Sequence, residues 1–282
     1  MPEGLRAGPP MVLVSRLISK ELIMPIQHWS RIRKYADLIQ GEGSRVARRI
    51  ERLPIGPEEK PIAIVGPMGS GKTQIARFIA RSLYCHGPGT PLKDPCMDCG
   101  ACKDSMRAGA LRADWLNEID ASQLGSDFSD VFIHVSLRYL FHAERYPEAI
   151  LLIDEFHRAS RSIQNSFVKV LDSNLQITYI LVSSAPREID PAILDRCFTM
   201  RLALPSETEV EDWLRRVCGA EGIDADEEAI KRMARETSGR PRAAQKLLSV
   251  CANAPGRITE RVVEENLDFI EDFSAYENGG DA

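Results

Sequence analysis

Short segments rich in consecutive apolar residues alternate along the chain with longer segments whose apolar positions recur every three or four residues. The apolar runs are IAIVG at 62–66, WLNEID at 115–120, AILLIDE at 149–155 and ITYILVSS at 177–184. The segments with helical spacing are 31–53, 73–84, 128–143 and 160–172. Continuous apolar runs are typical of strands buried on both faces, so the pattern predicts an α/β fold with a parallel sheet covered by helices.

Beyond residue 205 the strand pattern stops and only helical spacing remains. The segment SETEVEDWLRRVCGAEG begins with a serine and an acidic first turn, which favour a helix start, and it has glycines near its end. We therefore expect an α/β domain over 26–204 and a small all-helical domain over 205–270. Residues 1–25, which contain several glycines and prolines, are expected to form a flexible leader, and residues 271–282 an acidic tail.

A glycine-rich loop joins the first predicted strand to the helix after it, and its sequence GPMGSGKT matches GxxxxGK[ST] in full. Glycines allow consecutive backbone N–H groups to surround phosphates, the lysine meets the β and γ charges, and the threonine hydroxyl binds magnesium. The loop therefore predicts a site for a nucleoside triphosphate and magnesium. Its residues are Gly66, Pro67, Met68, Gly69, Ser70, Gly71, Lys72 and Thr73, with Gln74 directly after them.

Two adjacent carboxylates, Asp154 and Glu155, end the apolar run at 149–155. In a functional interpretation Asp154 binds magnesium through water, and Glu155 is the base that orients the water attacking the γ-phosphate. The alternative is an ordinary strand end with two solvated acids. We favour the functional interpretation because the pair follows the lysine of the loop within one α/β pattern.

Hydroxyls and arginines further along the chain are weaker candidates. Ser183 or Ser184, at the end of the next predicted strand, would hold the water or the γ-phosphate, although serine is also an ordinary turn residue. Arg196 follows a turn begun by proline, and Arg242 stands at a predicted helix start beside Pro241. Most arginines lie on the surface, but a guanidinium that reaches phosphate makes bidentate, charge-assisted hydrogen bonds.

Cysteines are concentrated in one stretch, because four of the seven fall within residues 85–102. The four, which predict a tetrahedral zinc site of thiolates, are Cys85, Cys96, Cys99 and Cys102. Alternatives are an iron–sulfur cluster, or reduced or redox-active thiols, and His86 is a competing ligand. The odd count and the clustering favour a reducing cytoplasm and a structural metal site over a disulfide framework.

Composition narrows the classes of protein that fit. The chain of 282 residues has 44% hydrophobic and 27% charged residues, which is ordinary for a globular protein. A formal net charge of −5 argues against a free-standing nucleic-acid binder and favours indirect or weak contact with nucleic acid. No apolar run approaches the roughly 20 residues that cross a bilayer, so no membrane span is expected.

In order along the chain, the phosphate loop, the cysteine run PCMDCGAC and the segments EIDAS, LIDEFHRAS, LVSSAP and ILDRC resemble the gamma/tau and delta-prime subunits of the bacterial replicative clamp loader. Those subunits are AAA+ ATPases, and the resemblance covers residues 31–204. It implies binding of phosphate and magnesium by Lys72 and Thr73 and hydrolysis through Asp154 and Glu155. It further implies a sensor 1 at Ser183 and Ser184, an arginine finger at Arg196, a sensor 2 at Arg242, and base contacts at Leu38 and Ile39.

The helical segment 205–270, with SGRPRAAQKLL and ITERVVEENLDFI, is similar to the lid of the Holliday-junction branch-migration motor. Together the resemblances imply a P-loop AAA+ domain with an inserted four-cysteine zinc knuckle, followed by a helical lid. The implied function is an ATP-hydrolysing, clamp-loader-like subunit of a homo- or hetero-oligomer in DNA replication or repair. Its expected partners are other AAA+ subunits and a sliding clamp or polymerase subunit. The rival functions are a branch-migration or protein-remodelling motor and a nucleotide-gated adaptor with little hydrolysis.

Overall fold

The structure, a computed structural model, describes residue 38 and residues 45–53, 61–87, 94–107, 112–113, 116–121, 149–172 and 177–270. The predicted helix at 128–143, the leader, the acidic tail and Ile39 lie outside these residues. None of the helices in the described ranges combines the length and the apolar character that crossing a bilayer requires.

One sheet forms the centre of the first part of the chain, with the strand order β2-β3-β4-β5-β1-β6. Its strands are β1 (Ile62–Val65), β2 (Arg112–Ala113), β3 (Leu116–Asp120), β4 (Ala149–Asp154), β5 (Ile177–Ser183) and β6 (Phe198–Arg201). Four predicted strands correspond to β1, β3, β4 and β5, and β6 adds a fifth parallel strand beside β1. The prediction of a parallel sheet is confirmed for these five strands, and the two-residue β2 extends the sheet at its edge, where it pairs antiparallel with β3.

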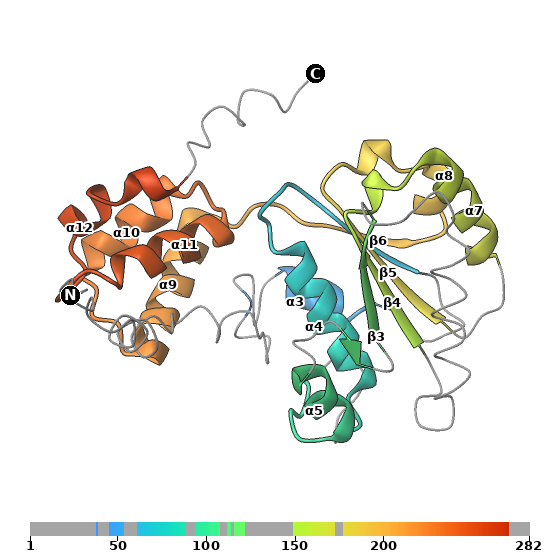
Figure 1. The fold of residues 1–282 in the computed structure, drawn as a ribbon, viewed down its shortest axis with the longest axis horizontal. Helices are drawn as coiled ribbons and strands as arrows, with labels where there is room; N and C mark the ends of the chain where they lie inside the picture. The colour runs from blue at the N-terminus through green and yellow to red at the C-terminus, as the bar shows by residue number, and fades with distance from the viewer. Residues whose placement is uncertain are drawn as a thin grey trace, which may run out of the picture.

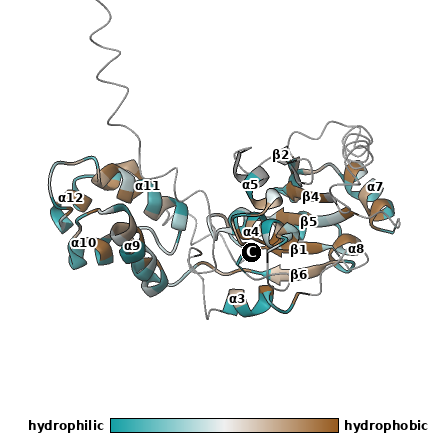
Figure 2. Ribbon diagram, turned by 90° about the horizontal axis from the view of Figure 1, so that it is seen from below, coloured by the Kyte–Doolittle hydropathy of each residue, from teal (hydrophilic) through white to brown (hydrophobic). Residues whose placement is uncertain are grey.

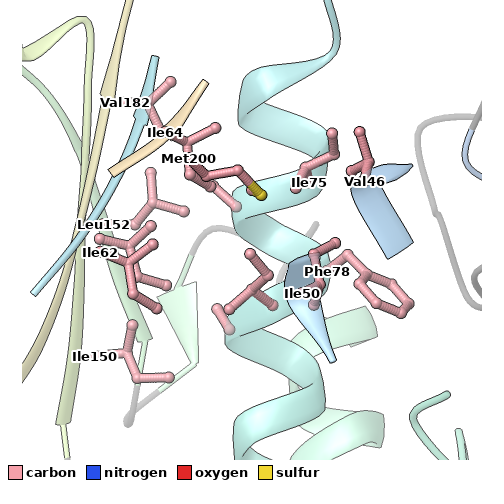
Figure 3. Close-up of a cluster of buried hydrophobic side chains, with 14 of the residues drawn as sticks. Val46, Ile50, Ile62, Ile64, Ile75, Phe78, Ile150, Leu152, Val182 and Met200 are labelled. Atoms are coloured by element: carbon pink, nitrogen blue, oxygen red, sulfur yellow. The ribbon is translucent and has the colours of Figure 1, made fainter. Parts of the chain in front are cut away.

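Helices cover both faces of this sheet, as the apolar runs predict (Figure 1). They are α3 (Arg45–Ile50), α4 (Lys72–Tyr84), α5 (Gly100–Arg107), α7 (Arg161–Leu171) and α8 (Pro191–Leu194), with 3-10 turns η3 (Phe156–Arg158) and η4 (Pro186–Glu188). On one face Ile62, Ile64 and Leu152 point toward α4 (Figure 3). Ile75 and Phe78 extend from the other side of α4, beside Val46 and Ile50 of α3. On the other face alternate residues of the same strands pack against α7 and α8.

The alternation along the strands explains why their sequences are apolar throughout. In β4, Ile150 and Leu152 belong to the core under α4, whereas Leu151 and Ile153 belong to the core under α7. Successive side chains of a strand point to opposite faces, so a strand covered on both sides needs apolar residues at every position. Figure 2 shows β1, β4 and β5 as a hydrophobic layer between the helices.

Up to residue 270, where the described part of the chain ends, four further helices and a 3-10 turn follow β6 and surround a core of their own. They are α9 (Glu207–Glu221), α10 (Glu227–Glu236), α11 (Pro241–Cys251), α12 (Glu260–Glu264) and η5 (Leu267–Phe269). Ser206 and Glu209 cap the start of α9 reciprocally, and Gly222 ends it in a left-handed conformation. Trp213, Met233 and Leu247 belong to the shared core. We call this part the lid. The exact domain boundaries stay a prediction.

Candidate nucleotide site and cysteine knuckle

The carboxyl ends of three parallel strands lie at one edge of the sheet and carry the predicted site residues. Val65 of β1 is in register with Ser183 of β5, and Ile153 of β4 is in register with Leu181 of β5. The phosphate loop leaves β1 at this edge, beside the end of β5, which lies between β1 and β4. The register therefore brings together residues that are separated by more than a hundred positions in the sequence.

The loop has the backbone geometry of an anion site. Gly69 and Gly71 have positive φ angles of 85° and 86°, a conformation that glycine adopts without strain. Gly71 is also the N-cap of α4 and provides no side-chain cap, so the first N–H groups of this 13-residue helix remain for another acceptor. The buried hydroxyl of Ser70 has no hydrogen-bond partner within the described part of the chain. A phosphate group fits this set of donors.

Lys72 stands at the start of α4 with only 5% of its surface exposed, and its Nζ donates to the carbonyl oxygen of Pro67 over 2.8 Å. Burial lowers the pKa of this ammonium group, and the positive charge of Arg242 acts in the same direction. The carboxylates of Glu155 and Asp154 oppose the shift. A polyanion such as a triphosphate, placed between Lys72 and Arg242, would stabilise the charged form of the lysine.

Thr73 and Asp154 form the predicted magnesium pair. The Thr73 hydroxyl donates to Asp154 Oδ2 over 2.9 Å, and Asp154 Oδ1 accepts from the backbone N–H of Glu155, also over 2.9 Å. Hydroxyl and carboxylate oxygens are the ligands that magnesium takes in phosphate sites, so this donor set fits the ion.

Glu155 follows the end of β4 in a left-handed conformation with φ 49°, which is uncommon for a residue other than glycine. Its Oε2 accepts from the Ser184 hydroxyl over 2.8 Å, so the predicted base and the predicted sensor are in direct contact. His157 Nδ1 lies 3.3 Å from the same oxygen. The sequence analysis missed His157, and its only signal is its place two residues after Glu155.

Ser183 lies deeper than Ser184. It is fully buried, its Oγ accepts from the N–H of Ala185 over 3.1 Å, and it lies 3.3 Å from His157 Nδ1. Ser184 is thus the hydroxyl that contacts Glu155 directly. Ser183 is linked to Glu155 through His157.

The two predicted arginines have different surroundings. The Arg196 guanidinium makes a bidentate pair with Asp172, at 2.8 and 3.2 Å, and its Nη1 donates to the carbonyl oxygen of Ala192. Its side chain remains 38% exposed. Arg242 lies in the first turn of α11, close enough for its charge to act on Lys72. Arg240, two residues earlier, lies within 3.5 Å of the point that a Gly69 Cβ would occupy, so the lid meets the loop here.

The remaining predicted nucleotide contacts are less defined. Leu38 is 3% exposed and packs in the core under α4, while its carbonyl oxygen accepts from Arg216 of α9 over 3.4 Å. Met68 of the loop is 54% exposed, and Gln74 is half-buried. The base contacts stay a prediction.

All four predicted cysteines converge where α4 ends and α5 begins, a site that we call the knuckle. Their Sγ atoms lie within 4.8 Å of one another. Tetrahedral zinc with bonds of about 2.3 Å needs sulfurs about 3.8 Å apart, so the cluster fits the ion after small adjustments. Backbone N–H groups support the sulfurs: Cys96 N donates to Cys85 Sγ over 3.0 Å, and Cys99 N donates to Cys96 Sγ over 3.3 Å.

These surroundings shift the thiol pKa values apart. The N–H groups of Asp98 and Cys99 lower the pKa of Cys96 to about 6. Burial raises the pKa of Cys85 and, more strongly, that of Cys102. A cation that binds all four as thiolates would offset the cost of ionising the buried pair.

Gly87 is a structural requirement of the knuckle that the spacing did not reveal. A Cβ at this position would lie 2.4 Å from the Cβ of Cys96 and 3.0 Å from its Sγ. No side chain fits there unless Cys96 moves away from the cluster.

Comparison with known proteins places this geometry in a family. Residues 62–205 match the model of the ATPase family associated with various cellular activities (AAA). The chain belongs to the AAA family. This finding agrees with the fold and with the class of enzyme that the motifs predict.

Among curated AAA relatives, the DNA polymerase III subunit gamma of Buchnera aphidicola subsp. Acyrthosiphon pisum is 30% identical over 202 residues, which is 71% of this chain and 54% of that protein. The tau subunit of Escherichia coli K12 is 26% identical over 249 residues, covering 87% of this chain and 37% of that protein. The chain thus spans about half the length of the first relative and 37% of the second.

Among solved structures, the Holliday junction branch migration motor RuvB of Thermotoga maritima aligns with a TM-score of 0.57 over 85% of this chain and 72% of its own. Its identity to this chain is 16%, so the likeness is one of fold.

Replacing Gly87 with alanine should open the knuckle, because the added methyl group collides with Cys96. We expect the zinc-supplemented wild type to protect its knuckle thiols from alkylation, and the Gly87→Ala protein to lose that protection. Mass spectrometry of the alkylated cysteines measures the difference. Gly100→Ala is the matched control, because nothing lies within 4 Å of a Cβ at that position. Equal protection in both variants would contradict the steric requirement.

Proposed function

We propose that this AAA chain is an ATP-hydrolysing, clamp-loader-like subunit of an oligomeric machine that acts in DNA replication or repair. One observation carries the proposal: Thr73 contacts Asp154, and Ser184 contacts Glu155, at the edge where the phosphate loop leaves the sheet. Nucleotide-binding and hydrolytic groups therefore form one continuous set. The printed names of the gamma and tau relatives support the replication context.

The residues have complementary roles in this mechanism. The loop N–H groups and Lys72 bind the β- and γ-phosphates. Thr73 and Asp154 would hold magnesium, which would neutralise the charge that develops on the phosphates. Glu155 orients the attacking water and accepts its proton, and the Ser184 hydroxyl donates to the γ-phosphate.

The knuckle is proposed to hold a structural zinc ion. Four cysteines fill a tetrahedral set and leave no position for a reacting water. Cys85 directly follows α4, whose 13 residues span about 20 Å, so the metal lies far from the phosphate loop at the other end.

An oligomer is proposed because Arg196 lies away from its own chain's loop contacts, paired with Asp172 on a partly exposed surface. A surface ion pair of this kind contributes little to stability, so the guanidinium is readily transferred to a neighbour's phosphate. We propose a cytoplasmic assembly with other AAA subunits, a sliding clamp or polymerase subunit as partner, and weak or indirect contact with DNA.

A second candidate, a motor or remodelling ATPase, is favoured by the alignment with the branch migration motor over 85% of the chain. Negative-stain images distinguish the two, because an open ring with a clamp partner supports the first and a closed hexamer supports the second.

Glu155→Gln should reduce ATP turnover about a hundredfold or more, because the amide cannot accept a proton from water. Binding of ATP should remain, whereas Lys72→Ala should lose it. Phosphate release and equilibrium binding measure the two effects, and Glu188→Gln, an exposed carboxyl on η4, is the control. Unchanged turnover in Glu155→Gln would remove Glu155 as the base and favour a nucleotide-gated adaptor.

Mixing two inactive variants tests the arginine finger. Arg196→Ala retains an intact loop, and Lys72→Ala retains an intact finger, so mixed oligomers should recover ATP turnover that neither variant shows alone. Steady-state turnover is measured at increasing ratios of the two proteins. Light scattering confirms assembly, and assembled mixtures without recovery would contradict a finger acting between copies.

A further inference from the structure

The surroundings of Glu155 include a residue to which neither the motifs nor the family resemblance assigns a role. We propose that His157 is a positioning residue for Glu155: it holds one carboxylate oxygen so that the other faces the attacking water. This inference rests on the proposed function, because it takes Glu155 as the group that acts on water.

His157 lies between the ends of β4 and β5. Its Nδ1 is 3.3 Å from Glu155 Oε2 and 3.3 Å from Ser183 Oγ, and its side chain is only 11% exposed. Because Ser183 is fully buried, this ring nitrogen contacts one group fixed in the sheet and one at the tip of the neighbouring strand.

The chemistry of the contact decides where the proton lies. An Nδ1 lone pair would face an acceptor oxygen of Glu155, and two acceptors at this distance repel each other. A proton on Nδ1 removes this repulsion and places the positive end of the N–H group beside both Glu155 Oε2 and Ser183 Oγ, the latter being its hydrogen-bond partner. We therefore place the proton on Nδ1, where it attracts the Glu155 carboxylate.

The local backbone keeps this donor in place. The φ of 49° at Glu155 turns the chain sharply, and Arg158 N donates to the Glu155 carbonyl oxygen over 2.8 Å. Phe156 is fully buried against Phe167, with ring centroids 5.2 Å apart. Phe156, the residue between Glu155 and His157, is therefore anchored in the core. This anchoring keeps the side chains of Glu155 and His157 in contact.

Ser184 explains why a second donor is needed. Its hydroxyl donates to the same Oε2 over 2.8 Å, yet it is also the group proposed to contact the γ-phosphate. One hydroxyl proton serves one strong acceptor at a time, so Ser184 leaves Glu155 when it donates to phosphate. His157 then remains to hold Oε2.

Three substitutions at His157 test this role in the full chain. Asn keeps an amide donor near the position of Nδ1, whereas Phe keeps a ring without a donor. We expect kcat for ATP hydrolysis to fall about tenfold in His157→Ala and His157→Phe, with KM changed less than about twofold, and His157→Asn to recover most of the loss. Arg158→Ala, exposed on the same turn, is the matched control.

Combining His157→Ala with Ser184→Ala gives a second readout. With nucleotide bound, Ser184 donates to phosphate while His157 holds Oε2, so the two losses are independent and the double variant should lose about the product of the two single losses in kcat. If His157 had a purely structural role, His157→Ala, His157→Phe and His157→Asn would all have a lower melting temperature. His157→Asn would then not recover kcat.

The outcomes separate this inference from the function on which it rests. Wild-type kcat in His157→Phe, a raised kcat in His157→Ala, or no rescue by His157→Asn would each overturn the positioning role. If Glu155→Gln abolishes turnover while every His157 variant retains it, only this inference fails. If the wild type hydrolyses no ATP, the proposed function fails as well.

Discussion

The site depends on the parallel register of β1, β4 and β5. Because Val65 lies beside Ser183, and Ile153 beside Leu181, the ends of the three strands meet at one edge of the sheet. The loop after β1, the carboxylates after β4 and the serines after β5 then share one small volume. A shift of one residue in a strand would turn its side chains to the opposite face, so the two apolar cores that fix the register also fix the chemistry.

Helix α4 connects the two functional features of this AAA domain. Its amino end carries the loop, Lys72 and Thr73, and its carboxyl end runs directly into Cys85. The hydrophobic side of the helix packs on β1, β4 and β5, which holds both ends in place. The knuckle is therefore fixed to the same rigid element as the phosphate loop, although it lies at the other end.

Much of this arrangement was predictable from local sequence. The loop, the apolar strands and the cysteine spacing each have a signature within a few residues, and the structure brings the four cysteines together as expected. The strand β6 was missed because FTMR has only one fully buried position and lies at the edge of the sheet. The contact of His157 with Ser183, the approach of Gly87 to Cys96 and the pairing of Arg196 with Asp172 were missed because each depends on the approach of segments that the sequence separates. Periodicity describes one element at a time and cannot reveal such contacts.

The central claim is that a triphosphate and magnesium bind where the loop meets the ends of β4 and β5. Isothermal titration calorimetry of the folded wild-type chain with ATP tests it most directly, with and without magnesium. The account predicts saturable binding of one nucleotide per chain that magnesium strengthens and that Asp154→Asn makes less dependent on magnesium. Absence of any heat of binding by folded protein in the presence of magnesium would contradict it.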